Sequence, residues 1–216
     1  GNGKLYIGHV HHGFSILSIK DKKVRNFVHD PNNRNSLPGN EVRCVYKDMN
    51  HNIWVGTNKG LALFNPESEN FIQFNSDGNL SHYIYDIRQL DGNKLWIAME
   101  FGGIAIMDLS QRLFLLPEQT QFHYIREGDD GYSLSNSSAR CIFQDSFKNI
   151  WTGVWGGGIN FLSYEPPLFS GYYYSPNQNS MSRLNNKTAS SICVDSQGKL
   201  WIGTDGGGIN VFDKGK

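Results

Sequence analysis

The sequence repeats one short frame five times, and this repetition restricts the possible folds more than any other feature. Each copy is centred on an aromatic anchor: Tyr6, Trp54, Trp96, Trp151 and Trp201. Successive anchors are 48, 42, 55 and 50 residues apart. The frame is clearest in IWTGVWGGGINFL and LWIGTDGGGINVF, which begin at Ile150 and Leu200. A repeat of this length indicates an array in which each copy forms one supersecondary unit.

Each repeat is predicted to form four short β-strands, as the second repeat illustrates. Its expected strands are 42–47, 53–57, 61–65 and 71–75, and turns rich in Asp, Asn and Gly separate them. No segment sustains the 3.6-residue periodicity of a helix. Four-stranded units of this length are typical of β-propellers, whereas a solenoid or a sandwich would not place an aromatic residue at the same point of each unit. We therefore predict an all-β propeller made of four-stranded antiparallel blades.

The repeats divide the chain into four to five blades. We expect a partial blade at 1–35, blades at 36–80, 81–126 and 137–175, and a second partial blade at 187–216. The first partial blade has the last three strands of a blade and the second has the first three. The two ends therefore overlap instead of completing one blade. This pattern predicts part of a larger propeller, and the alternative is a closed ring of five blades.

The fixed positions of the frame have structural explanations. We expect the aromatic anchors to fill the space between neighbouring blades, and the small residue two positions later to permit close approach of backbones. An acid stands six residues before three of the anchors, and the third repeat carries Asp91 one residue nearer to Trp96. The GGG triplets are not phosphate loops, because no helix follows them and the P-loop lysine is missing.

Composition excludes several classes of protein. Lys and Arg together number 20, as do Asp and Glu, so the formal net charge is zero and a nucleic-acid partner is not expected. No apolar run reaches the ~18 residues of a membrane helix. The aromatic content of 13% is too high for a disordered chain. Cys44, Cys141 and Cys193 fall in the predicted first strands of different blades, where we expect them to be buried and unpaired.

One position of the frame varies while its neighbours do not. It lies four residues after each anchor, at the tip of the turn between the second and third strands, and is occupied by Val10, Asn58, Glu100, Trp155 and Asp205. Loops at this end of a propeller are a common place for ligands. Trp155 and Phe101 are candidates to stack on a sugar ring, and Asn58, Glu100 and Asp205 are candidates to bind hydroxyl groups. The alternative is that solvent tolerates any residue at the tip.

Neither a metal site nor a catalytic site is predicted, and no cofactor is expected. GHVHHG places His9, His11 and His12 on one tip, but adjacent histidines in a turn diverge and no carboxylate lies nearby in the sequence. No Ser–His–Asp order or pair of carboxylates emerges. Sialidase turns carry Asp five residues before Trp, whereas here the separation is six. Arg43 and Arg140 occupy equivalent positions, but no third arginine completes a sialidase cluster. The repeat of streptogramin lyases is approached only by LWIAME.

The stretch VDSQGKLWIGTDGGGINVFD, residues 194–213, resembles the repeat of the two-component regulator propellers. The linkers HDPNNRNSLPGN, EGDDGYSLSNSS and SPNQNSMSRLNN are similar to the Asp-Pro-Asn…Ser-Leu…Asn loop of that family. The resemblance covers nearly the whole chain. It is weaker at Tyr6, which replaces Trp, and in LWIAMEFGG, which lacks the Gly-Thr pair.

This resemblance implies the periplasmic sensor region of a hybrid two-component histidine kinase, in which these blades would be part of a seven-bladed propeller. It also implies a ligand, an oligosaccharide from polysaccharide breakdown, and a parent protein whose membrane helix, kinase, receiver and DNA-binding domain lie outside these residues. A neighbouring propeller or a second copy of the chain is the other expected partner, with no direct membrane contact in this part. Two alternatives stay open: a propeller enzyme with lyase-like or glycosidase-like activity, and a scaffold that mediates dimerisation.

Overall fold

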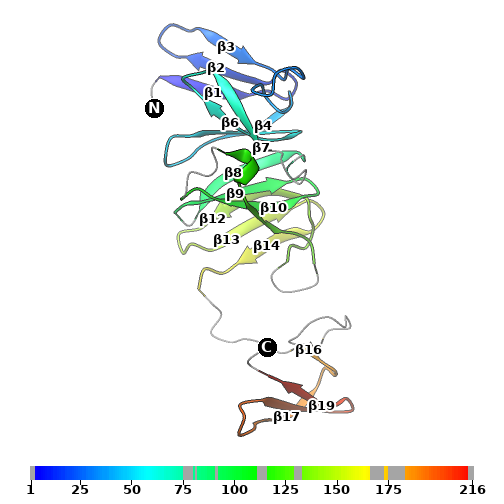
Figure 1. Ribbon diagram of the computed structural model, residues 1–216. Helices are drawn as coiled ribbons and strands as arrows, with labels where there is room; N and C mark the ends of the chain where they lie inside the picture. The colour runs from blue at the N-terminus through cyan, green and yellow to red at the C-terminus, as the bar shows by residue number, and fades with distance from the viewer. Residues whose placement is uncertain are drawn as a thin grey trace. The chain divides into compact units, whose positions relative to one another are not determined.

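A computed structural model describes residues 3–74, 80, 82–90, 92–110, 116–128, 133–165, 173–174 and 183–213. The chain divides into two compact units, Gly1–Glu165 and Pro166–Lys216, which we call unit 1 and unit 2. Apart from the short 3-10 helix Pro117–Gln119, the regular elements of the described residues are all strands (Figure 1). The prediction of an all-β fold is confirmed. None of the described helices has the length and apolar composition that crossing a membrane requires.

Unit 1 contains four antiparallel sheets among its described residues, and each sheet is built from consecutive strands. We call them blades 1 to 4 (Figure 1). Blade 1 consists of β1 (Lys4–Gly8), β2 (Phe14–Ser18) and β3 (Val24–Phe27). Blade 2 consists of β4 (Val42–Lys47), β5 (Ile53–Thr57), β6 (Gly60–Asn65) and β7 (Asn70–Phe74). Blade 3 consists of β8 (Ile84–Leu90), β9 (Lys94–Met99), β10 (Gly103–Asp108) and β11 (Phe122–Ile125). Blade 4 consists of β12 (Ala139–Gln144), β13 (Ile150–Val154) and β14 (Gly158–Leu162).

Unit 2 contains one antiparallel sheet of β17 (Ala189–Val194), β18 (Leu200–Thr204) and β19 (Gly208–Phe212) in its described part. The run GYYY was expected to supply the last strand of the 137–175 blade, and its first two residues lie outside the described residues. Its last two form β15 (Tyr173–Tyr174), which pairs in parallel with β16 (Arg183–Leu184).

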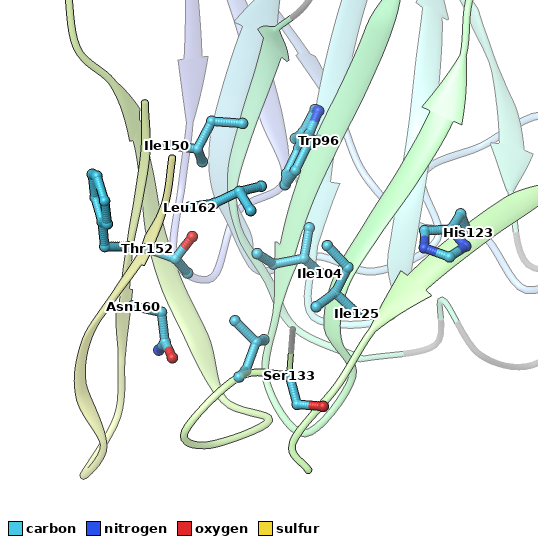
Figure 2. Close-up of a pocket in the computed structure, with 11 residues that line it drawn as sticks. Trp96, Ile104, His123, Ile125, Ser133, Ile150, Thr152, Asn160 and Leu162 are labelled. Atoms are coloured by element: carbon cyan, nitrogen blue, oxygen red, sulfur yellow. The ribbon is translucent and has the colours of Figure 1, made fainter. Parts of the chain in front are cut away.

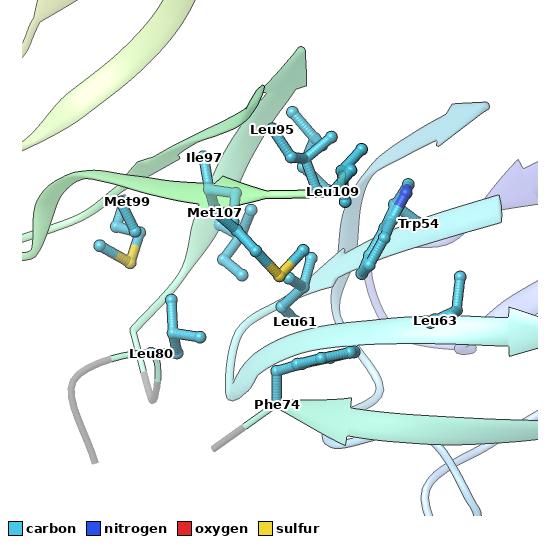
Figure 3. Close-up of a cluster of buried hydrophobic side chains, with 13 residues drawn as sticks. Trp54, Leu61, Leu63, Phe74, Leu80, Leu95, Ile97, Met99, Met107 and Leu109 are labelled. Atoms are coloured by element: carbon cyan, nitrogen blue, oxygen red, sulfur yellow. The ribbon is translucent and has the colours of Figure 1, made fainter. Parts of the chain in front are cut away.

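Apolar side chains between successive blades form the core of unit 1. Blades 1 and 2 meet through the rings of Phe14, Phe27, Phe64 and Phe71, whose centroids lie 5.1–6.0 Å apart. Blades 2 and 3 enclose a larger cluster that includes Trp54, Leu61 and Phe74 from blade 2 and Leu95, Ile97 and Met107 from blade 3 (Figure 3). Strands such as β5 and β9 are buried on both faces, which explains their nearly continuous apolar sequences.

The anchor tryptophans face the sheet that follows their own in the sequence. Trp54 is buried in the cluster that contains Leu95 of blade 3, and Trp96 is buried against blade 4. These two confirm the predicted position between blades. For Trp151 and Trp201 the prediction is wrong, because their side chains are 39% and 38% exposed. Blade 4 is the last described sheet of unit 1, and β17–β19 is the last described sheet of unit 2, so these anchors lie on outer faces of their units.

The exposure of the cysteines has the same cause, because each lies on the face of its sheet that carries the anchor. All three are unpaired, as predicted, but Cys141 and Cys193 are exposed and Cys44 is only partly buried. Cys44 faces blade 3, where its Sγ lies 3.8 Å from the carbonyl oxygen of Ile84. Cys141 is the equivalent residue of blade 4, and Cys193 lies beside Trp201 on the outer face of its sheet. Their expected burial is therefore wrong. Burial raises the pKa of the Cys44 thiol well above its ordinary value.

The acid six residues before the anchor closes the turn between the first two strands. Asp48 Oδ2 accepts hydrogen bonds from Trp54 Nε1 at 2.9 Å and from Asn52 Nδ2 at 2.7 Å, and its Oδ1 accepts one from the Asn52 backbone N–H at 2.8 Å. Asp145 and Asp195 accept the indole N–H of their own anchors at 3.0 and 2.8 Å. These indole bonds are the main reason that the pKa values of Asp145 and Asp195 are lowered.

No such clamp is formed among the described residues of blade 3. Leu90 stands six residues before its anchor, and Asp91 lies outside the described residues. The buried Nε1 of Trp96 consequently has no hydrogen-bond partner among the described residues.

Candidate functional site

One residue near the start of the first strand leaves the hydrogen-bonded ladder in four sheets. In blade 2, Val42 pairs with Thr57 and Cys44 pairs with Gly56, so Arg43 has no opposite residue on β5. The corresponding residues of the other three sheets are Tyr85, Arg140 and Ser190. Such a β-bulge re-aims the side chain of the extra residue. We call these four positions the bulge residues.

The variable tip residues are held at the same end of the sheets. The backbone N–H groups of Asn58, Glu100, Trp155 and Asp205 donate to the carbonyl oxygens of Glu41, Tyr83, Ser138 and Thr188, at 2.9, 2.9, 2.8 and 3.0 Å. Each of these carbonyls lies two residues before the bulge residue of the same sheet. The backbone therefore fixes each of these tips beside a bulge.

In unit 1, the bulge residues of blades 2, 3 and 4 lie together with the tip residues of blades 3 and 4. The guanidinium carbon of Arg140 lies 3.8 Å from the ring centroid of Tyr85 and 5.1 Å from that of Trp155. Its Nη2 lies 2.6 Å from Oε1 of Glu100 on the neighbouring blade. Arg43 approaches the other side of this group, with its guanidinium carbon 6.0 Å from the Tyr85 centroid. We call Arg43, Tyr85, Glu100, Arg140 and Trp155 the bulge–tip cluster.

Two further residues border Arg43. Its Nη2 donates to Oε2 of Glu41 at 3.2 Å, and the hydroxyl of Tyr83 donates to Oε1 of the same carboxylate at 3.4 Å. The rings of Tyr83 and Tyr85 stack with centroids 6.3 Å apart. Two arginines thus face two glutamates, and these residues carry no net formal charge. The Nε of Arg140 is buried and has no hydrogen-bond partner among the described residues.

The two aromatic residues selected from the sequence lie side by side at this end. Trp155 is 69% exposed and Phe101 is 73% exposed. The backbone N–H of Phe101 lies 3.3 Å from the Ser138 hydroxyl, on the residue whose carbonyl accepts the Trp155 N–H. Phe101 has a φ of 58°, in the left-handed region that glycine favours, and the corresponding residue of blade 4 is Gly156 with a φ of 70°. An exposed aromatic side chain is therefore held in an uncommon backbone conformation.

The other two candidate residues lie elsewhere. Asn58 is partly buried, and its Oδ1 lies 3.4 Å from the backbone N–H of Glu41, so its side chain supports the loop before β4. Asp205 belongs to unit 2 and is described there, at the tip of its own sheet beside the bulge residue Ser190. The structure thus gathers Trp155, Phe101 and Glu100 at one end of blades 3 and 4, and Asn58 borders this group through Glu41.

The histidines of the first tip do not converge. His9 Nε2 lies 2.9 Å from the Ser15 hydroxyl. Among the described residues, no group of three His, Cys, Asp or Glu side chains is arranged to hold a metal ion.

Sequence reasoning missed Tyr83 and Tyr85 as members of the site. The signal in the sequence is the equivalent position of Arg43 and Arg140 in their repeats. Tyr85 stands at the same position in blade 3, so aligning all the first strands would have placed it between the two arginines.

A separate cavity of about 380 Å³ lies between blades 3 and 4 (Figure 2). Its walls include Trp96, Ile104, Ile125, Ile150 and Leu162. Between blades 1 and 2, the positions equivalent to Ile104, Ile125 and Leu162 are all phenylalanines, as the strand registers show. Smaller side chains therefore leave a hollow that is filled by aromatic rings in the other interface.

Comparison with known proteins agrees with this architecture. The model of the two-component regulator propeller family matches residues 36–59 and 183–206. The structure is similar to that of the extracellular domain of the hybrid two-component system BT3049 from B. thetaiotaomicron, with 58% sequence identity and a TM-score of 0.67 over 100% of this chain. The extracellular domain of BT4673 from the same organism is 18% identical, with a TM-score of 0.60 over 99% of this chain, and shows the shared fold alone.

These relatives are much longer than the present chain. It spans 26% of the BT3049 chain and 28% of the BT4673 chain. A curated relative, histidine kinase P4 of Formosa agariphila, is 30% identical over 86 residues, which is 36% of this chain and 6% of that protein. Residues 36–59 and 183–206 match two-component regulator propeller repeats, and the chain is similar to the extracellular regions of these hybrid two-component systems.

Proposed function

We propose that this region senses an oligosaccharide through the bulge–tip cluster, and that a histidine kinase elsewhere in the parent protein transmits the signal. The exposed ring of Trp155 beside Arg140 carries this proposal. A tip that only closed a turn would need no aromatic residue, since the other tips hold Asn58, Glu100 and Asp205.

The chemistry of the cluster suits a sugar. The C–H face of a pyranose ring packs on an aromatic ring, and Trp155 offers a wide apolar surface at the end of the blade. Hydroxyl groups require nearby donors and acceptors, which Arg140 and its partner Glu100 supply beside Trp155. Phe101 adds a second exposed ring one blade away.

Isothermal titration calorimetry with a panel of purified oligosaccharides tests the proposal. We expect saturable binding to the chain, weakened by about 5–100-fold in Trp155→Ala, as for aromatic residues at other binding sites. Phe147→Ala is the matched control, because Phe147 is 79% exposed on the same blade and lies in the turn at the opposite end of β13.

Three outcomes would count against the proposal. They are the absence of binding by every sugar of the panel, equal weakening by the two substitutions, and turnover of a bound sugar. The last result would favour the enzyme alternative.

A further inference from the structure

We infer that the bulge–tip cluster accepts a neutral saccharide and discriminates against saccharides that carry carboxylate or sulfate groups. This inference rests on the proposed function and specifies the class of ligand. It follows from the balance of charges, the use of the arginine faces and the arrangement of donors and acceptors in the cluster.

The two arginines of the cluster are already paired with carboxylates of the protein. Arg140 lies 2.6 Å from Glu100, and Arg43 lies 3.2 Å from Glu41. Arg140 and both glutamates are partly buried, and Arg43 is exposed. An anionic group that approached either guanidinium would also approach a glutamate of like charge, in surroundings that water screens only in part. A site for an anion would instead present arginine without a carboxylate partner, so that both oxygens could bind.

The flat faces of the arginines are occupied as well. The guanidinium of Arg140 lies against Tyr85 and near Trp155, with centroid distances of 3.8 and 5.1 Å. Arg43 lies 5.8 Å from the centroid of Tyr83. These cation–π contacts use the positive charge within the protein and hold the rings in place. The arginines therefore serve as fixed hydrogen-bond donors beside aromatic surfaces.

The polar groups that a ligand can contact in this cluster are alternating hydrogen-bond donors and acceptors. Each guanidinium has five N–H groups, and the ion pairs with Glu41 and Glu100 use only some of them. Glu41, Glu100 and the tyrosine hydroxyls have free acceptor capacity. A sugar hydroxyl both donates and accepts, so adjacent hydroxyls of a neutral ring match this alternation. A carboxylate or sulfate accepts only, and would leave Glu100 facing another acceptor.

The test compares neutral and acidic oligosaccharides of equal length by calorimetry, at about 50 and about 500 mM NaCl, with the full 216-residue chain. We expect a neutral sugar to bind, with a Kd that changes less than about 2-fold with salt, because screening weakens contacts between charges and not those of a neutral ligand. Acidic sugars of the same length should bind at least about 10-fold more weakly.

Glu100→Gln supplies an independent readout, because it removes one negative charge and conserves the shape of the side chain. It should weaken a neutral sugar by about 3–10-fold, through loss of a charged acceptor, and should strengthen binding of acidic sugars. Phe147→Ala is again the control and should leave both unchanged.

The outcomes separate this inference from the proposed function. Tighter binding of an acidic sugar that depends on Trp155 would overturn the inference and leave the sensor proposal standing. Binding of no sugar from either class would refute the proposed function, and the inference with it. Neutral binding that is lost in Trp155→Ala and reduced in Glu100→Gln supports both.

Discussion

Replacing Asp48 with alanine should destabilise unit 1 far more than the same change at its repeat equivalent, Asp145. Both carboxylates accept an anchor indole N–H and two hydrogen bonds from an asparagine, at closely similar distances. The surroundings differ, because Asp48 and Trp54 are buried whereas Trp151 is partly exposed. Asp145 Oδ1 also accepts the backbone N–H of Phe147 at 2.9 Å, which adds to the cost of losing Asp145, so a smaller loss at Asp145 still reports the effect of burial.

The magnitude follows from the groups left without partners. A hydrogen bond to a charged group contributes about 1.5–3 kcal/mol, and a buried donor that loses its acceptor costs about 1–3 kcal/mol. Asp48→Ala leaves the indole N–H of Trp54 inside the core between blades 2 and 3. Since these contributions overlap, we expect a loss of about 3–4 kcal/mol in the free energy of unfolding. Water can replace the carboxylate at Trp151, so Asp145→Ala should cost less than half as much.

Urea unfolding followed by far-ultraviolet circular dichroism measures both changes, with the slope against denaturant checked for constancy. The two residues lie in the same unit, so both variants report on the same structure. A double-mutant cycle with Trp54→Phe, which removes the indole donor, should give a coupling energy of about 1–3 kcal/mol with Asp48→Ala. Equal losses for the two alanine variants, or a coupling energy near zero, would refute the reasoning.

Three further results are expected. Trp54→Ala should lower the free energy of unfolding by about 3–5 kcal/mol and Trp151→Ala by clearly less, because only Trp54 is enclosed between blades; thermal melts of the two variants compare them. The pKa of Asp145 is lowered, chiefly by the Trp151 indole bond. The contribution of ionised Asp145 to the stability of the fold is therefore complete above the unfolded pKa of about 3.9, and it is lost as the pH falls through the folded pKa. Asp145→Asn should therefore make stability less steeply dependent on pH below about 4, and an unchanged acid titration would contradict this. A thiol reagent should label Cys141 rapidly and Cys44 slowly, because burial raises the pKa of Cys44; the reverse order, read by mass spectrometry of peptides, would contradict the assigned faces of β4 and β12.

Most of the fold could be predicted from the repeated frame. The expected strands 42–47 and 53–57 coincide with β4 and β5, because an apolar run between turn residues is a local signal. The burial of Trp54 and Trp96 followed from the same frame. The exposure of Trp151 could not follow from it, because the frame is nearly the same at Trp54 and Trp151 and burial depends on the side chains that lie opposite.

The candidate site was predictable only in part, for a related reason. Trp155 stood out because the other tips are polar or aliphatic, and its exposure agrees with its place at a tip. The bulges left no mark in composition, because a shift of one residue in pairing changes the direction of a side chain without changing its type. Tyr85 stands at the same place before its anchor as Arg43 and Arg140, but only the register between β8 and β9 shows that it leaves the ladder.

The bulges have a consequence for how such a domain can evolve. Arg43, Tyr85, Arg140 and Ser190 differ in size, charge and aromatic character, yet the pairs that flank them keep the same register in each sheet. A residue outside the ladder can change without altering the pairing that holds its sheet together. Selection can therefore alter recognition through single substitutions at bulges and tips, and duplicated copies of a gene can diverge in specificity while their blades stay the same.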